Sequence, residues 1–276
     1  MRPIVFRTLR REYRLHAPPE IRQQLLFMET TPTISGVELE IVDIEARLRD
    51  GFVVATLPGG RLIEGSANNL LSALHQLVMQ DLIDTEPGAP FVHGATVVVD
   101  DRRLLMVAQK GSGKSTLALH LAMQGHQVEG DEHLVIRERE VVARPRTLRV
   151  KPGTLSLVAG LPPSVWDAPF IANWDDSPIR AVSPAIGGQD WVIRSGRLSG
   201  IVFLVANHGG RSAARRIAAE DAFRRLMRNV LLPSAGVAMA AGRLRQLAAT
   251  TPAYRLLLGN LDVAEWHLRS IAGLLT

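Results

Sequence analysis

Residues 108–116, Ala-Gln-Lys-Gly-Ser-Gly-Lys-Ser-Thr, constrain the fold of this chain more than any other segment. The apolar run Leu104–Val107 enters the segment with the length of a short buried strand, and Thr116–Met123 leaves it with helical apolar spacing. A glycine-rich turn between a strand and a helix is a setting in which backbone amides and a helix N-terminus bind phosphate. The segment therefore predicts an α/β fold with a phosphate-binding loop.

Each part of this loop has an expected task. Gly111 and Gly113 let backbone amides turn inward around an anion. Lys114 is expected to reach the β- and γ-phosphates of ATP, and the Ser115 hydroxyl to ligate Mg²⁺. Ala108 stands where glycine is usual, so we expect a different backbone type at the loop entry. The predicted nucleotide-binding residues are Gly111, Ser112, Gly113, Lys114, Ser115 and Thr116.

A pair of acids, Asp131-Glu132, follows the loop after a single predicted helix that ends at 124–126. An apolar strand is predicted at 134–136, directly after the pair. A strand beside the loop strand would bring both carboxylates to the γ-phosphate. One could then hold Mg²⁺ while the other accepts a proton from an attacking hydroxyl. Two adjacent acids also fit an exposed acidic turn, but the nearby phosphate loop favours the functional interpretation.

In combination these segments resemble HPr kinase/phosphorylase. The resemblance is carried by His93-Gly94 before an apolar strand, the loop itself, Gly125-His126 at the helix end, and Asp131-Glu132. It covers roughly residues 90–150. It implies an α/β P-loop kinase domain of the HPr kinase and phosphoenolpyruvate carboxykinase-like type, with phosphate transferred to a serine hydroxyl.

The resemblance also implies individual roles. Asp131 would be the catalytic base, His93 would lie beside it and tune its protonation, and Lys114 would serve the phosphates. Ser115, Asp131 and Glu132 would be near Mg²⁺, with Glu132 standing where the family usually has aspartate. From its residue type and position alone, His93 is equally well explained as a structural histidine.

The chain departs from this family after the acids. The glycine-rich signature linked to phosphorylase activity has no counterpart in Lys151–Ser156, so we expect neither reverse phosphorolysis nor HPr as the substrate. The stretch Pro145–Gly153 instead resembles divergent HPr-kinase-like proteins, including kinases for the terminal serine of lasso-peptide precursors. The expected acceptor is thus a peptide or small protein with a serine hydroxyl. Arg149 and Lys151 fit either solvated cations or contacts to phosphate or an acidic peptide.

Chain length and a break in the predicted regular structure indicate two domains. At 276 residues and 46% hydrophobic content, the chain can bury one large core or two modest ones. Thr85–Pro90 interrupts regular structure, which predicts an N-terminal α+β domain over 1–87 and a catalytic domain over 88–276. The first unit carries no chemical motif, so we expect it to recognise the acceptor or to join subunits of a homo-oligomer.

Composition excludes several classes of protein. With Cys 0 there is no disulfide framework, and a cytoplasmic setting is expected. No apolar run is long enough to span a membrane. The net charge of +5 comes from scattered arginines, and only 5% of residues are aromatic, so we do not expect nucleic-acid binding.

Periodicity predicts the remaining elements. We expect a hairpin over 52–63, a helix over 68–82, and a long loop over 162–188 that contains Trp166 and Trp174 and either contacts the acceptor or simply packs on the body. Further on we expect a strand at 200–205, helices at 218–230 and 234–249, a strand at 254–258 and a last helix from Val263.

The sequence thus favours an ATP-dependent serine kinase. Two alternatives stay open, because a phosphate-binding loop serves many activities. One is a nucleotide-binding regulatory ATPase without transferase activity, and the other is a small-molecule kinase.

Overall fold

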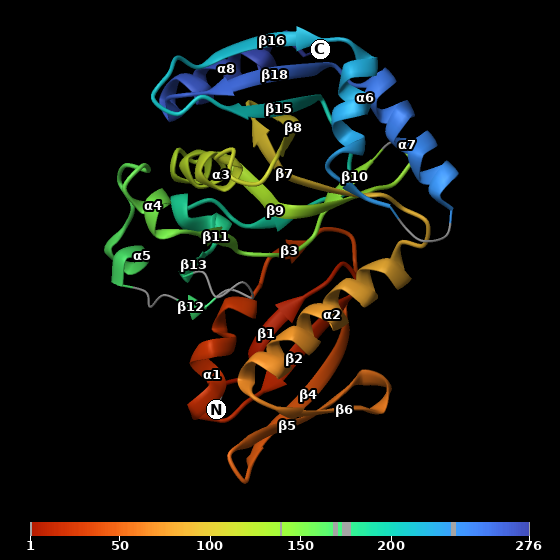
Figure 1. The fold of residues 1–276 in the computed structure, drawn as a ribbon, viewed down its shortest axis with the longest axis vertical. Helices are drawn as coiled ribbons and strands as arrows, with labels where there is room; N and C mark the ends of the chain where they lie inside the picture. The colour runs from red at the N-terminus through yellow and green to blue at the C-terminus, as the bar shows by residue number, and fades with distance from the viewer. Residues whose placement is uncertain (1, 139, 168–170, 173–177, 233–235, 276) are drawn as a thin grey trace.

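A computed structural model of the chain describes residues 2–275 except 139, 168–170, 173–177 and 233–235. Within these ranges the chain forms a smaller N-terminal module, residues 4–85, and a larger main body, residues 91–274 (Figure 1). The predicted contact of Trp174 with an acceptor lies outside the described residues. Among the described helices, none has the length and apolar character needed to cross a membrane.

The N-terminal module is a five-stranded sheet with helix α2 packed on one face. Alternating side chains such as Val53, Ala55 and Leu57 are buried on that face with Leu70 and Leu74 of the helix. The strand order is β1-β2-β4-β5-β6. The elements are β1 (Ile4–Arg7), β2 (Arg11–His16), α1 (Pro19–Leu25), the 3₁₀ turn Leu26–Met28, β4 (Glu40–Arg49), β5 (Phe52–Leu57), the 3₁₀ turn Pro58–Gly60, β6 (Arg61–Gly65) and α2 (Ala67–Thr85).

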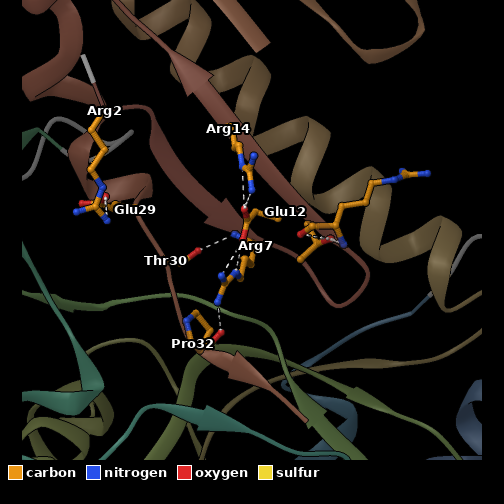
Figure 2. Close-up of polar contacts among 9 residues, drawn as sticks. Arg2, Arg7, Glu12, Arg14, Glu29, Thr30 and Pro32 are labelled. Carbon is orange, nitrogen blue, oxygen red and sulfur yellow. Dashed lines mark hydrogen bonds and ion pairs between the residues drawn. The ribbon is translucent and has the colours of Figure 1, made fainter. Parts of the chain in front are cut away.

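A short strand, β3 (Thr33–Ile34), connects the module to the main body. In Figure 2, Arg7 donates to Glu12 at 2.9 Å and to the Pro32 carbonyl at 2.6 Å, which anchors the segment that precedes β3. The strand then pairs in parallel with β14 (Val192–Ile193). Two segments more than 150 residues apart in sequence are joined in this way.

The main body is built on an eight-stranded sheet in which β8, β15 and β18 are parallel and central. The run Gly200–Leu204 is buried on both faces, as expected for a central strand. The path is β10-β9-β7-β8-β15-β18-β16, and β17 pairs with β7. The strands are β7 (Phe91–Val99), β8 (Arg102–Ala108), β9 (Gln127–Ile136), β10 (Val141–Ala143), β15 (Gly200–Ala206), β16 (Ala213–Ile217), β17 (Val230–Leu231) and β18 (Ala253–Leu258).

Helices cover both faces of this sheet (Figure 1). The helices α3 (Lys114–Met123) and α8 (Leu261–Leu274) bury apolar residues against one face. The other face is covered by α6 (Ala219–Met227) and α7 (Val237–Thr250). This layered arrangement confirms a mixed α/β fold, and it leaves the carboxyl ends of the parallel strands open to ligands.

A small layer lies beyond α3. It consists of β11 (Leu148–Val150), α4 (Pro152–Leu155), α5 (Pro163–Asp167), β12 (Ile171–Ala172), β13 (Pro178–Val182) and the 3₁₀ turn Pro184–Gly187. The segment expected to be a long loop therefore contains short regular elements. Trp166 in α5 is 46% exposed, so it is not an anchor buried in the body.

Candidate functional site

The loop between β8 and α3 has the backbone geometry that an anion site requires. Gly111 and Gly113 have φ angles of 85° and 87°, in the left-handed region that favours glycine. Gly113 is the N-cap of α3, and its carbonyl accepts the first helical hydrogen bond from Leu117 at 2.9 Å. Ala108 is the last residue of β8 and has no positive φ, so this position does not need glycine.

Lys114 begins α3, and its side chain is 7% exposed. Its ammonium group contacts a carboxylate oxygen of Asp131, whose side chain is 2% exposed. Burial lowers the pKa of Lys114 to about 7. The loop lysine and the predicted base therefore meet where little of either side chain is exposed.

Asp131 reaches the loop from an unexpected strand. It lies inside β9, because this strand already begins at Gln127 rather than after the two acids. The strand β9 is not next to β8, since β7 lies between them. Asp131 nevertheless meets Lys114 because α3 packs over this part of the sheet.

Glu132 lies apart from this pair. Successive side chains in a strand point to opposite faces, so Glu132 faces away from the loop. It pairs with Arg144 at 3.2 Å and also contacts Arg146, both of which are buried. The pleat of β9 thus separates the two carboxylates, and the expectation that both serve the γ-phosphate and Mg²⁺ stays a prediction.

Two histidines lie on the Asp131 side of the sheet. His93 on β7 pairs with His133 on β9, and their ring centroids are 5.9 Å apart in an edge-to-face arrangement. Burial first, and then the positive charge of Lys114, lowers the pKa of His93 to about 4. Burial, with Arg144 and Lys114, lowers the pKa of His133 to about 4 as well. Both imidazoles are therefore neutral at pH 7.

Sequence reasoning missed His133, although a signal for it exists. With β9 extended back to Gln127, alternation places His133 on the face of Asp131. It also missed Thr154 of α4, whose hydroxyl lies 3.1 Å from that of Thr116. No local pattern predicts this contact, because 38 residues separate the two threonines.

The residues at this site can accommodate Mg²⁺ only together with a phosphate ligand. No group of three or more His, Cys, Asp or Glu side chains in the described part of the chain could hold a metal by itself. Mg²⁺ commonly uses one or two protein ligands and takes the rest of its shell from phosphates and water. Asp131 and the Ser115 hydroxyl meet that requirement.

Two cavities flank the loop at the carboxyl ends of the parallel strands. The first, of about 300 Å³, lies on the α3 and α8 side and is bordered by Gly113, Thr116, Leu157, Leu261 and Asp262. We call it the nucleoside cavity. The second, of about 370 Å³, lies on the α6 side and is bordered by Gln109, Ser112, Arg225, Arg228 and Arg255. We call it the arginine cavity.

Comparisons with known proteins do not assign this chain to a family. No family model matches it, and no curated protein matches it. In structure it is similar to the Hpr(Ser) kinase/phosphatase from Coxiella burnetii, at 13% sequence identity and a TM-score of 0.35, with 66% of this chain and 93% of that chain covered. A likeness at this level is too distant to define an activity.

Proposed function

We propose that this chain is an ATP-dependent phosphotransferase that moves the γ-phosphoryl group to a serine hydroxyl of a peptide or small protein. The observation that supports this most directly is the buried contact between Lys114 and Asp131 at the end of the loop. A loop that only binds nucleotide needs the lysine. A buried carboxylate aimed at the same point supplies the base that phosphoryl transfer to a hydroxyl uses.

The nucleoside cavity supports the binding half of this proposal. It borders Gly113 and Thr116, two of the predicted nucleotide-binding residues, and Leu157 and Leu261 give it an apolar lining. Leu157 is 62% exposed, so its side chain is accessible for contact with a purine ring. The cavity volume of about 300 Å³ is at the lower end of the range of small-molecule sites.

The proposed mechanism assigns one task to each group. Backbone amides at Gly111–Lys114 hold phosphate oxygens, and the Lys114 ammonium stabilises charge on the γ-phosphoryl group. A triphosphate competes with Asp131 for that ammonium, which leaves the carboxylate free to accept the proton of the acceptor hydroxyl. Mg²⁺, held by Ser115 and Asp131, would supply further charge neutralisation at the phosphates. Neutral His93 and His133 limit the positive charge around Asp131, so the carboxylate retains its basicity.

The decisive experiment is intact-mass spectrometry of candidate serine-containing peptides after incubation with MgATP. We expect a gain of one phosphoryl group with the wild-type chain. Lys114→Ala should abolish transfer and weaken MgATP binding. Asp131→Asn should keep most nucleotide affinity and lower transfer by roughly 10²-fold or more, the usual scale of general-base loss.

Four results would overturn parts of this proposal. Wild-type turnover by Lys114→Ala would show that the loop does not take part in phosphoryl transfer. ATP hydrolysis without transfer to any peptide would favour the regulatory ATPase, and phosphorylation of free metabolites alone would favour the small-molecule kinase. Equal losses of MgATP binding and transfer in Asp131→Asn would make Asp131 chiefly a metal ligand.

A further inference from the structure

The arginine cavity lies beside the phosphate loop and is positively charged. Its volume is about 370 Å³, and the loop contributes Gln109 and Ser112 to its wall. Arg225 in the last turn of α6 and Arg228 at the C-cap of this helix line the cavity, and so does Arg255 in the middle of β18. Among the described residues, no acidic side chain lines this cavity.

Among the described residues, Asp221 is the one carboxylate that pairs with an arginine of this wall. Arg225 pairs with Asp221 at 3.1 Å and lies over the ring of Phe203 at 5.9 Å. Arg255 stands directly opposite Arg215 in the antiparallel pair of β18 and β16, so two cations face each other across the strands. The Nε atom of Arg255 is buried and has no hydrogen-bond partner. Like charges at this spacing repel, and an anion between them would relieve the repulsion.

The nucleoside cavity has the opposite character. It borders the same loop from the other side, yet its described lining holds Asp262 together with His120 and His208 and no arginine or lysine. A neutral nucleoside suits that cavity, because the Asp262 carboxylate can accept hydrogen bonds from hydroxyl and amino groups and repels phosphate. The arginine cavity suits a group that carries negative charge. Charge therefore distinguishes the two sides of the loop.

The arginine cavity is also connected to the proposed catalytic side chains. Asn229 lines the cavity, and its carbonyl accepts a hydrogen bond of 2.7 Å from the backbone amide of His93. The strand that follows, β17, pairs with β7 on the same side. Val107, which also lines the cavity, pairs with Gly94 of β7, so the cavity is one strand away from the β7 and β9 pair that holds His93 and Asp131.

We infer that Arg225, Arg228 and Arg255 form a subsite for an oxyanion of the phosphoryl acceptor, either a carboxylate or a phosphate group. The subsite would hold the acceptor while its hydroxyl lies near Asp131. This inference rests on the proposed function for the identity of the ligand, but the anion site itself is testable without transfer.

The test is calorimetric titration of the full-length chain after saturation with Mg²⁺ and a non-hydrolysable ATP analogue, so that the loop is filled. One arm uses inorganic phosphate, and the other uses a short glutamate-rich peptide. We expect Arg228→Gln and Arg255→Gln each to weaken binding of the preferred probe by about tenfold, the scale of one charge-assisted hydrogen bond. Arg255→Lys should recover part of the loss. Tighter binding in one arm identifies the source of the oxyanion.

Arg224→Gln is the matched control, since Arg224 lies on the same helix, is 64% exposed and pairs with Glu220. Its affinity for both probes should stay at the wild-type value. Equal affinities in all variants, or an equal loss in Arg224→Gln, would overturn the subsite. So would weaker analogue binding in Arg255→Gln with unchanged probe binding, which would assign the arginine to the triphosphate. Thermal unfolding of each variant separates these results from misfolding.

The analogue titration is carried out first, and it tests the proposed function separately. If the analogue does not bind, the phosphate and peptide titrations are run on nucleotide-free Lys114→Ala, in which the loop cation is absent. Probe binding that still depends on Arg228 and Arg255 would support the subsite while the proposed function fails. If neither probe binds to nucleotide-free Lys114→Ala, the subsite is overturned.

Discussion

At the scale of single residues, Asp131 and Glu132 differ because the strand that carries them is pleated. Asp131 points to Lys114, and Glu132 points to two buried arginines on the other face. A carboxylate that already neutralises Arg144 and Arg146 has few lone pairs left for a metal. We therefore expect Glu132 to contribute to stability through a buried ion pair rather than to Mg²⁺ binding.

We expect Glu132→Gln to lower the melting temperature by roughly 5–10 °C, because removing one partner of a buried ion pair costs about 3 kcal/mol. The folded variant should bind MgATP like the wild type. Glu64→Gln is the control, since Glu64 is exposed on the strand β6. An unchanged melting temperature together with weakened Mg²⁺ binding would show instead that Glu132 is a Mg²⁺ ligand. Differential scanning calorimetry and nucleotide titration measure the two effects.

The pKa of Lys114 leads to a pH prediction. Because burial lowers this pKa to about 7, much of Lys114 is unprotonated at pH 8 before nucleotide binds. A triphosphate favours the charged ammonium and raises its pKa. Binding of MgATP should therefore take up a proton at pH 8 and very little at pH 6, where Lys114 is already charged.

Calorimetry in buffers of different ionisation enthalpy measures this uptake. Lys114→Arg is the control, because arginine keeps the charge but does not titrate in this range. Its proton uptake at pH 8 should be close to zero. The same uptake in Lys114→Arg and wild type would show that another group carries the proton.

At the scale of elements, the two loop glycines have the same conformation in different surroundings. Both have positive φ angles, so any side chain is strained there. A Cβ atom at Gly113 would also lie 2.8 Å from a methyl group of Leu258 on β18, whereas a Cβ atom at Gly111 would meet nothing within 4 Å. Close packing of the loop against β18 therefore adds a second constraint at Gly113 only.

We expect Gly113→Ala to weaken MgATP binding and lower stability more than Gly111→Ala, for which backbone strain costs about 1–2 kcal/mol. The double variant Gly113→Ala/Leu258→Ala should recover part of the added loss by removing the methyl group. Nucleotide titration and thermal unfolding provide the comparison. Equal effects of the two single substitutions would mean that contact with Leu258 is unimportant.

At the scale of the whole molecule, the N-terminal module has its own core but is fastened to the main body in several places. Its strand β3 pairs with β14, and its Met79 lies 3.2 Å from Arg144. Glu86, the residue directly after the module, accepts from Arg137 at 3.0 Å. Leu82 packs in the core of the main body rather than in that of the module. A division at residue 87 stays a prediction, and these contacts would resist it.

We expect a chain that begins at Gly88 to keep MgATP binding, because every residue assigned to the phosphates lies beyond that point. Its melting temperature should fall, since Leu82 and the β3 partner of β14 are lost. Transfer to a peptide should fall sharply if the module docks the acceptor. Full transfer by a folded truncation would contradict a role in acceptor recognition, so thermal unfolding must be measured beside activity.

Much of the molecule could be predicted from local sequence. The strand, glycine turn and helix at 104–123, the hairpin at 52–63 and helix α2 agree with the structure within a few residues. These elements are specified by turn chemistry, caps and apolar spacing, all of which act over short distances. Ser66 and Asn69, for example, form a reciprocal capping box at the start of α2.

The tertiary structure alone decided which side chains meet. Strand order places β7 between β8 and β9. Because β9 is pleated, Asp131 points to Lys114 of the loop and Glu132 points to Arg144 and Arg146. The arginine cavity combines α6 and β18 with the loop, so its charge is invisible in a chain whose arginines are scattered. The sequence by itself determined the chemistry of the loop, because neighbouring residues build it. Its surroundings depend on contacts between distant segments, and only packing of the whole chain fixes those.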